Sequence, residues 1–237
     1  MNAPGAPRFD SRSGDAELMD VPGLDPLELA ETLGQLAVIN RFLGGHAATL
    51  HGLSRLLPAG RREIEVLDVG SGGGDSARRV VEWAGRRGIA ARVHGIDLSA
   101  ESVAFARRTG AGSPGLEFTT SDLFDLPMTR KYDVVHAALV LHHLSDEMAA
   151  AALAKMFALS RFGVVINDLH RHPAAYEAIK WLTALLSKNR LIRHDAPLSV
   201  LRAFRRADLQ DLARRAGLSA VEISWRWPFR WVMVARK

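Results

Sequence analysis

Cysteine is absent from this sequence of 237 residues. Its absence excludes disulfide bonds, thiolate metal sites and cysteine nucleophiles, and it fits a reducing compartment. No apolar run approaches the roughly 18 residues that suggest a membrane span. The first residues also lack the basic segment followed by an apolar one that marks a secretory signal. We therefore expect a cytoplasmic protein without a membrane span.

Acidic side chains are scarce in the last third of the sequence. Residues 161–237 carry 15 Lys and Arg against 6 Asp and Glu, whereas the whole chain carries 31 against 26. The simplest interpretation is a solvated, arginine-rich surface. The alternatives are a basic face for an anionic substrate, a carrier-bound substrate or a membrane surface.

The sequence pattern divides the chain into three segments. Residues 1–17 are rich in Pro, Gly, Ser and charge, which predicts a mobile tail. In residues 18–60 leucines recur at helical spacing and the pattern breaks near Gly44, which predicts an N-terminal lid of two helices. Residues 61–237 alternate between β-rich runs and helical patterns, with a helical insertion over about 173–205 that is expected to complete the lid.

The alternation of strands and helices predicts a parallel sheet with helices on both faces. Parallel strands are expected at residues 64–69, 92–96, 116–119, 132–138 and 162–166. Two further strands, 221–225 and 231–235, are expected to form an antiparallel pair at the sheet edge. The expected fold class is therefore α/β, with a Rossmann-like, mostly parallel, seven-stranded sheet and ligands bound at the carboxyl ends of its strands.

A glycine-rich turn follows the first predicted strand, where residues 66–75 read VLDVGSGGGD. Glycines let the backbone turn sharply and let a ligand lie against main-chain N–H groups at the start of the next helix. A dinucleotide-binding loop would have a glycine at position 75, but this chain has an aspartate there. Asp75 would oppose a pyrophosphate and suits a ligand with a cationic centre. No Gly-Lys-Ser/Thr follows, which excludes a P-loop.

The pattern Asp68-x-Gly70-x-Gly72-x-Gly74 resembles the first motif of the class I methyltransferases that use S-adenosylmethionine (SAM). Further segments resemble the family's next motifs in order and spacing. Asp97 ends the second strand about 20 residues after the loop, Asp122 closes the third, and YDVVH at 132–136 matches the fourth. The resemblance covers about residues 64–145 and implies an enzyme, a methyltransferase with SAM as its cofactor.

The resemblance also implies which residues hold SAM. The loop backbone and Asp68 would hold the methionine moiety, while Asp97 and Asp122 would hold the ribose and the adenine. The cofactor-binding residues expected on this basis are Asp68, Gly70, Ser71, Gly72, Gly74, Asp97, Leu98, Asp122, Leu123 and Ala138.

Histidines follow the fourth and fifth predicted strands, in LHHLSD at 141–146 and NDLHRH at 167–172. Because histidine titrates near neutral pH, one on this rim could take a proton from a phenol, an enol or an amine as the methyl group transfers. The candidate catalytic residues are His143, His142 and His170. The alternative is a structural role, since Leu-His-His-Leu recurs in family members of differing chemistry.

No metal is expected, although Asp168, His170 and His172 offer ligand types. Catechol-type methyltransferases hold Mg²⁺ through acids after both strands, whereas the fourth strand here ends in two alanines, at 137 and 138. The family's branch that methylates amino groups of DNA carries Asn/Asp-Pro-Pro-Tyr/Phe after that strand. This chain lacks that motif, so nucleic acid is disfavoured as a partner.

The methyl acceptor is expected to bind between the two parts of the lid, which together suggest an apolar-walled cavity with a cationic rim. The candidate substrate-binding residues are Arg41, Phe42, His46, Arg171 and Trp181. The alternative is that these helices only pack on the sheet domain. Segments 40–45 and 193–200 resemble bacterial small-molecule methyltransferases of secondary metabolism, some of which act on phenolic polyketides or quinone-like lipids.

The expected function is methyl transfer to a small aromatic, phenolic or lipid-like acceptor of secondary metabolism, with O-methylation favoured. The alternatives are N- or C-methylation of a small metabolite or a carrier-bound intermediate. RNA methylation and a non-catalytic SAM-binding role are less favoured. The chain is expected to act as a monomer or a homodimer.

Overall fold

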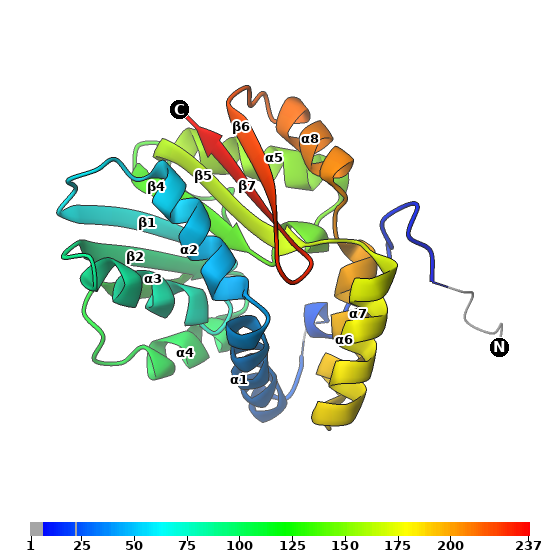
Figure 1. Cartoon of the computed structure of the whole chain (residues 1–237). Coiled ribbons are helices and arrows are strands. Elements are labelled where there is room, and N and C mark those ends of the chain that lie inside the picture. The colour runs from blue at the N-terminus through cyan, green and yellow to red at the C-terminus, as the bar shows by residue number, and fades with distance from the viewer. Residues whose placement is uncertain (1–6, 22) are drawn as a thin grey trace.

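The computed structural model describes residues 7–21 and 23–237 (Figure 1). Its centre is a seven-stranded sheet in the order β3-β2-β1-β4-β5-β7-β6. The strands span β1 Glu63–Val69, β2 Ala90–Asp97, β3 Leu116–Thr120, β4 Tyr132–Ala138, β5 Ser160–Leu169, β6 Val221–Arg226 and β7 Arg230–Arg236.

The first five strands are parallel, and β7 pairs antiparallel with both β5 and β6. All seven residues of β4 except the last are buried, as expected for a strand that is covered on both faces. The α/β fold class predicted from the sequence, including the antiparallel C-terminal pair, is confirmed.

Helices cover both faces of this sheet. They span α1 Pro26–Phe42, α2 Gly45–Leu56, α3 Asp75–Gly85, α4 Ala100–Thr109, α5 Asp146–Leu159, α6 Pro173–Leu186, α7 Arg190–Arg202 and α8 Arg206–Arg215. Helices α2, α3 and α4 pack on one face, and α5 and α8 pack on the other. Each face therefore has its own apolar core, one around Leu53, Val80 and Val103 and one around Leu153, Met156 and Leu209.

Helices α1, α6 and α7 lie outside the two helical layers, near the carboxyl ends of the central strands (Figure 1). Helix α7 begins at Arg190, inside the helical insertion predicted over about 173–205. Asn189 caps it, because its side-chain Oδ1 accepts the N–H groups of Leu191 and Ile192 at 2.9 and 3.2 Å. Within the described part of the chain, no helix is both long and apolar enough to cross a membrane.

The segment before α1 differs from the mobile tail that its composition suggests. Residues 1–6 of that predicted tail lie outside the described residues. Farther along, the Arg12 guanidinium donates to the carbonyl groups of His142, Leu144 and Arg202, and the side chain of Glu17 is buried. Buried charges and hydrogen bonds to distant segments of the chain hold residues 12–17 on the sheet domain. Composition does not reveal such contacts.

Candidate active site

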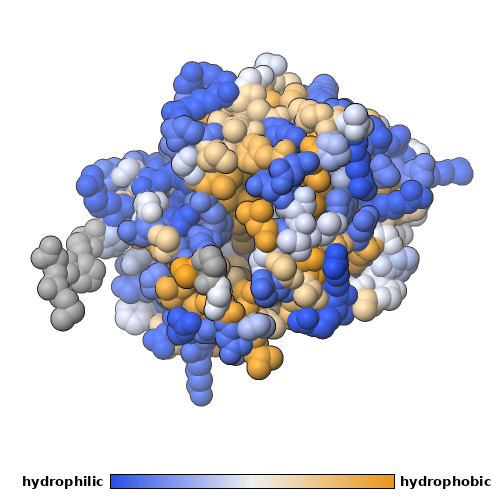
Figure 2. Space-filling view, turned by 180° about the vertical axis from the view of Figure 1, so that it is seen from behind, coloured by the Kyte–Doolittle hydropathy of each residue, from blue (hydrophilic) through white to orange (hydrophobic). Residues whose placement is uncertain are grey.

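A cavity of about 1030 Å³ opens at the carboxyl ends of β1, β2 and β4. Helices α1, α6 and α7, the short helix Leu18–Asp20 and the turn between β6 and β7 close its other sides. Figure 2 shows hydrophobic residues gathered around the centre and the lower part of the face seen from behind, with hydrophilic residues farther out. The volume lies at the upper end of the range for small-molecule sites.

The glycine loop forms one wall of the cavity, because its backbone adopts conformations that only glycine takes readily. Gly70, Gly72 and Gly74 have φ of +64°, +49° and +72°. A Cβ atom on Gly70 would lie 2.6 Å from a methyl group of Val140, and one on Gly74 would lie 2.6 Å from the Phe118 ring. The loop therefore presents bare backbone to the cavity at the start of α3.

Asp68 is a buried carboxylate at the end of β1 and is 1% exposed. Its Oδ2 atom has no hydrogen-bond partner among the described residues, and its Oδ1 atom lies 3.4 Å from Nε2 of His136. Burial raises the pKa of Asp68 well above its usual value, and the carboxylates of Asp75 and Asp97 raise it further. A buried anion of this kind at a cavity wall would be stabilised by a cationic group of a ligand.

The other two motif carboxylates lie on the same wall. Asp97 accepts the N–H groups of Gly72 and Ser99 at 2.8 and 2.9 Å, so it fixes the glycine loop against β2. Asp122 accepts the N–H of Phe124 at 2.9 Å and lines the cavity beyond Asp97. Both carboxylates keep acceptor capacity for a ligand's hydroxyl or amino groups.

Asp75 begins α3 and is bound to α2 through His46. Its carboxylate lies 2.6 Å from Nε2 of His46, in the first turn of α2. Burial alone would raise the pKa of Asp75, but the hydrogen bond and the charge of His46 outweigh it and lower that pKa. The pair anchors the α1–α2 junction beside the glycine loop.

Across the cavity, His142 lies in the turn after β4 and is held by a buried carboxylate. Its Nδ1 atom lies 2.7 Å from Oδ1 of Asp168 on β5. Although burial opposes ionisation, the charge and hydrogen bond of His142 lower the pKa of Asp168. A carboxylate on Nδ1 fixes the ring and favours the tautomer whose Nε2 atom can accept a proton.

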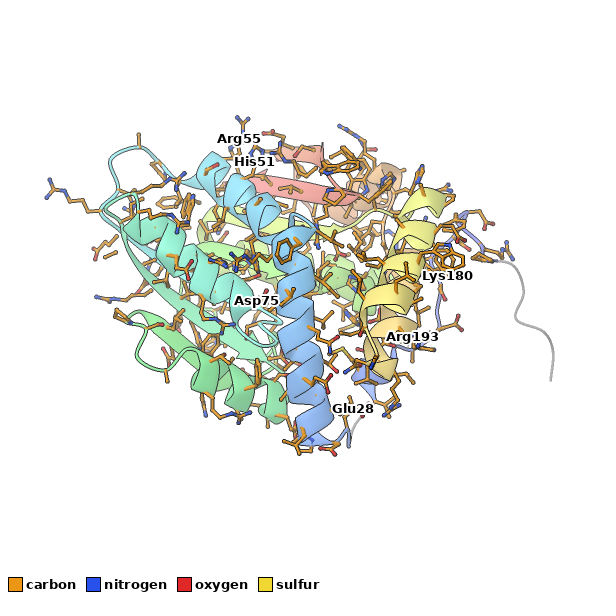
Figure 3. All side chains as sticks on the ribbon, turned by 60° about the horizontal axis from the view of Figure 1, so that its bottom comes forward. Glu28, His51, Arg55, Asp75, Lys180 and Arg193 are labelled. Atoms are coloured by element: carbon orange, nitrogen blue, oxygen red, sulfur yellow. The ribbon has the colours of Figure 1, made fainter. Side chains whose placement is uncertain are left out.

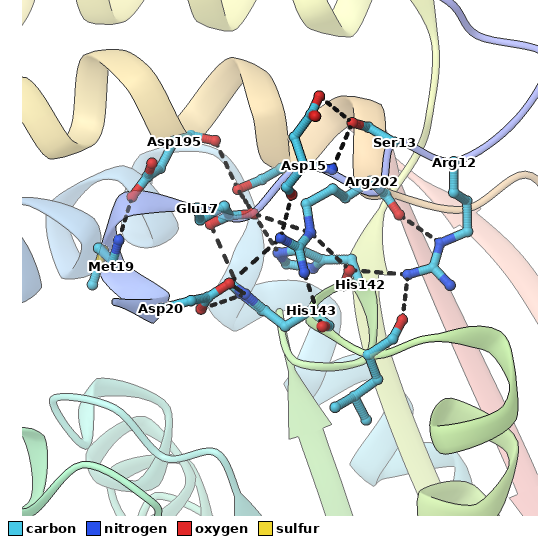
Figure 4. Close-up of polar contacts among 12 residues, drawn as sticks. Arg12, Ser13, Asp15, Glu17, Met19, Asp20, His142, His143, Asp195 and Arg202 are labelled. Atoms are coloured by element: carbon cyan, nitrogen blue, oxygen red, sulfur yellow. Dashed lines mark hydrogen bonds and ion pairs between the residues drawn. The ribbon is translucent and has the colours of Figure 1, made fainter. Parts of the chain in front are cut away.

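Glu17 brings a second carboxylate to this place from the N-terminal segment (Figure 4). Its Oε1 atom lies 3.7 Å from Nε2 of His142, and its Oε2 atom lies 4.0 Å from Nε2 of His143. Burial raises the pKa of Glu17 to about 7. Asp20 lies 3.0 Å from Nδ1 of His143, so Glu17, Asp20, His142 and His143 form one polar cluster on the cavity wall.

Two residues of α7 hold this polar cluster in place. Asp195 accepts the N–H groups of Leu18 and Met19 at 2.8 and 3.0 Å. Arg202 donates to the carbonyl oxygens of His142 and His143 and lies 3.8 Å from Glu17 (Figure 4). The N-terminal segment and the turn after β4 are thus joined through one helix.

Among the described residues, one group has the residue types and spacing to hold a metal ion. Glu17, His142 and His143 offer ligand atoms that all lie within 4.8 Å of one another. This group of possible metal ligands differs from Asp168, His170 and His172, the residues with metal-ligand side chains that the sequence analysis named. The Arg202 guanidinium already supplies positive charge beside Glu17.

The structure brings most of the sequence-predicted cofactor and histidine positions to this one cavity. Every predicted cofactor-binding residue except Gly74 lines it. Of the predicted catalytic residues, His142 and His143 line it but His170 does not. His170 packs against Trp231 and accepts a hydrogen bond from Trp225, and burial together with the charge of His172 lowers its pKa to about 4.

Of the predicted substrate-binding residues, Phe42 alone lines the cavity. The buried Arg171 guanidinium bonds to backbone carbonyls and to Asp208 instead. Arg41 and Trp181 point to solvent, and His46 is bound to Asp75. The sequence analysis missed Glu17 and Asp195, because no local pattern marks an isolated acid as part of a distant site.

The comparisons with known proteins agree with this geometry. A family model described as a methyltransferase domain matches residues 66–163, which contain the glycine loop, Asp97, Asp122 and the two cavity histidines. The chain contains a class I, SAM-dependent methyltransferase domain. Its cofactor is SAM, and the site fits the positively charged methionine end of SAM because Oδ2 of the buried Asp68 carboxylate has no hydrogen-bond partner among the described residues.

Solved structures share the fold of this methyltransferase at low sequence identity. Human N-acetylserotonin methyltransferase, in complex with SAM, has a TM-score of 0.63 and 19% identity, over 92% of this chain and 61% of its own. A SAM-dependent methyltransferase from Aquifex aeolicus has a TM-score of 0.61 and 17% identity, over 90% of this chain and 99% of its own.

Magnesium protoporphyrin IX methyltransferase from Synechocystis, with bound SAM, has a TM-score of 0.53 and 18% identity, over 89% of this chain and 80% of its own. The comparison with curated proteins gives no match. At these identities the likeness concerns the fold, so the choice of acceptor must be argued from the cavity of this chain.

Proposed function

We propose that this methyltransferase transfers the methyl group of SAM to a phenolic or enolic oxygen of a small, largely apolar acceptor. One observation carries the proposal. The part of the cavity away from the glycine loop is walled mainly by apolar side chains and contains the polar cluster of Glu17, Asp20, His142 and His143.

The half of the cavity at the sheet edge suits SAM. We propose that Asp68 and the loop backbone at 70–74 bind the methionine moiety, that Asp97 binds the ribose hydroxyls and that Asp122 binds the adenine. The unpartnered Oδ2 atom of Asp68 and the acceptor capacity of Asp97 and Asp122 support these roles. Gly74 would act through its backbone conformation alone.

The other half of the cavity suits an aromatic or lipid-like acceptor. Helices α1, α6 and α7 contribute apolar residues to this wall, among them Leu36, Ile39, Phe42, Ala178, Ile179, Leu182, Ile192 and Val200. Burial of apolar surface against such a wall gives roughly 25 cal/mol per Å². We propose that residues 18–60 and the insertion at 173–205 together form a lid over the SAM-binding domain.

The polar cluster would activate the acceptor. SAM supplies a methyl group that is already activated, so the protein's task is to align the acceptor oxygen with it and to remove the acceptor's proton. We propose that Nε2 of His142 takes this proton while Asp168 stabilises the resulting cation. His143 and Glu17 would orient the acceptor's hydroxyl group. An amine or a carbon acid would meet the same groups, so N- and C-methylation, including that of a carrier-bound intermediate, are the alternatives.

A labelling experiment tests the proposal. The protein is incubated with methyl-labelled SAM, a panel of phenols and amines, and extract from its host, and the labelled product is identified by mass and NMR. Asp68→Asn should weaken SAM binding by roughly tenfold or more, since a hydrogen bond to a charged group contributes about 1.5–3 kcal/mol. Asp125→Asn, an exposed carboxylate in the loop after Asp122, is the matched control.

A labelled phenolic ether as the product supports the proposal. A product labelled on an amine nitrogen or on a carbon atom would support N- or C-methylation instead. Formation of no S-adenosylhomocysteine by a protein that binds SAM would favour a non-catalytic SAM-binding role. Labelled RNA would favour the RNA-directed alternative. The cytoplasmic location and the monomeric or homodimeric state stay predictions.

A further inference from the structure

Large apolar side chains are exposed on three separate elements that also contribute residues to the cavity wall. These residues, called the rim patch below, are Phe42 on α1, Trp181, Leu185 and Leu186 on α6, and Trp227 in the β6–β7 turn. Their exposed fractions lie between 61% and 79%. Single exposed apolar residues are common, but five on elements that line one cavity are typical of an interaction surface.

Helix α6 has apolar side chains on two sides. Packing within the protein accounts for the apolar residues on only one of these sides. Ile179 and Leu182 face the cavity, and Thr183 is buried in the contact with α7. Trp181 and Leu185, four residues apart, lie together on the solvent side, where the fold gains nothing from an aromatic or a leucine side chain.

Basic residues outnumber acidic ones around the rim patch. Lys180, Lys188, Arg190 and Arg193 belong to α6, α7 and the link between them, whereas Glu177 is an exposed acid on α6 one turn before Trp181. Figure 3 labels Lys180 and Arg193. Glu28 of α1 pairs with Arg190 at 2.8 Å. Lys180, Lys188 and Arg193 have no carboxylate within ion-pair distance in the described part of the chain, so their positive charge is available to an anionic partner.

We propose that the rim patch docks the methyltransferase on the surface of a bilayer that contains anionic phospholipids, with α6 lying in the interface. Tryptophan, phenylalanine and leucine beside flanking lysine and arginine are the composition of helices that lie in that interface. Exposed leucines would contribute nothing to contacts with nucleic-acid phosphates. Basic residues near an anionic leaflet each contribute about 1 kcal/mol of attraction.

This docking would place the opening of the cavity against the lipid, so that a lipid-like acceptor could enter without crossing water. The delivery of acceptor rests on the function proposed above. Membrane binding itself does not, and it can be measured without any acceptor.

Vesicle flotation tests the docking with the full chain bound to S-adenosylhomocysteine. We expect binding to vesicles of phosphatidylcholine with phosphatidylglycerol and little binding to phosphatidylcholine alone. Lys180→Ala and Lys188→Ala should each lower the partition coefficient about fivefold, and high salt should do the same. Trp181→Ser with Leu185→Ser should abolish binding. Met148→Ser with Arg92→Glu, exposed positions on α5 and β2, is the matched control and should leave binding unchanged.

Absence of flotation by wild-type protein that still binds SAM would overturn the docking proposal. So would a stable dimer in solution that Leu185→Ser dissociates, because a second copy would then cover the rim patch. Rim variants that lose flotation but methylate a soluble acceptor normally would support docking as a function separate from catalysis. Wild-type protein that floats with the vesicles but transfers no methyl group to any acceptor would instead count against the proposed function.

Discussion

Nδ1 of His142 lies 2.7 Å from Oδ1 of Asp168, and both side chains are almost completely buried. The pair joins the turn after β4 to the end of β5 and leaves Nε2 of His142 facing Glu17 across 3.7 Å. The imidazole is therefore oriented by the fold before any acceptor binds, which is the arrangement expected of a preorganised base.

His142→Ala should lower kcat by about 10²–10⁴-fold, the usual contribution of general acid–base catalysis, while SAM affinity stays within about twofold. Asp168→Asn should also lower kcat, because the amide can donate to Nδ1 and place the ring proton on Nε2. Single-turnover rates and SAM titration measure both effects. His172→Ala, on a ring that lies off the cavity and caps α6, is the control. Unchanged turnover in His142→Ala would exclude His142 as the base.

Glu17 should make stability depend on pH. Burial raises its folded-state pKa from the ordinary 4.5 to about 7, so ionisation of Glu17 opposes folding. Its stabilising contribution is fully present below pH 4.5 and is lost as pH rises through 7. Glu17→Gln should remove this loss, which is at most about 3.4 kcal/mol because one pKa unit corresponds to about 1.36 kcal/mol. Denaturant unfolding of both proteins between pH 4.5 and 8 measures the difference, and parallel curves would show that Glu17 does not titrate in this range.

Chelation should leave turnover unchanged. Glu17, His142 and His143 have the ligand types for a divalent ion. However, Arg202 lies 3.8 Å from Glu17 and supplies the positive charge that an ion would bring. Elemental analysis of the purified protein, and rates before and after EDTA treatment, measure this. One equivalent of metal that leaves together with activity, and whose return restores it, would show that the cluster is a metal site.

Gly70→Ala should destabilise the protein more than Gly88→Ala. Both glycines have positive φ, +64° and +70°, which costs alanine about 1–2 kcal/mol. At Gly88 the new methyl group meets open space, whereas at Gly70 it would lie 2.6 Å from Val140. Gly70→Ala should also weaken SAM binding, because the loop must shift. Thermal unfolding and SAM titration compare the two variants, and equal destabilisation would mean that Val140 moves aside freely.

The local pattern of the sequence was sufficient to predict the fold and the residues of the glycine-loop wall of the cavity. Three predictive features are properties of short segments. They are the strand and helix periods, the glycines with positive φ, and the acids at the ends of β1, β2 and β3. Parallel strands bring their carboxyl ends to one edge, so Asp68, Asp97 and Asp122 were expected to meet there.

The wall of the cavity opposite the glycine loop was decided by tertiary packing. Glu17 and His142 are 125 positions apart in the sequence, and Arg12 and Arg202 join their segments through bonds to backbone carbonyls. Strand β5 ends at Leu169, after which the chain forms a bridge between His170 and Phe204, so His170 is directed away from the cavity. Sequence periodicity extends over a few residues, whereas side-chain contacts between distant segments depend on how the helices pack. For this reason the sequence predicted which residues of the glycine-loop wall line the cavity, and only the folded chain decided which histidines and which carboxylate line the opposite wall.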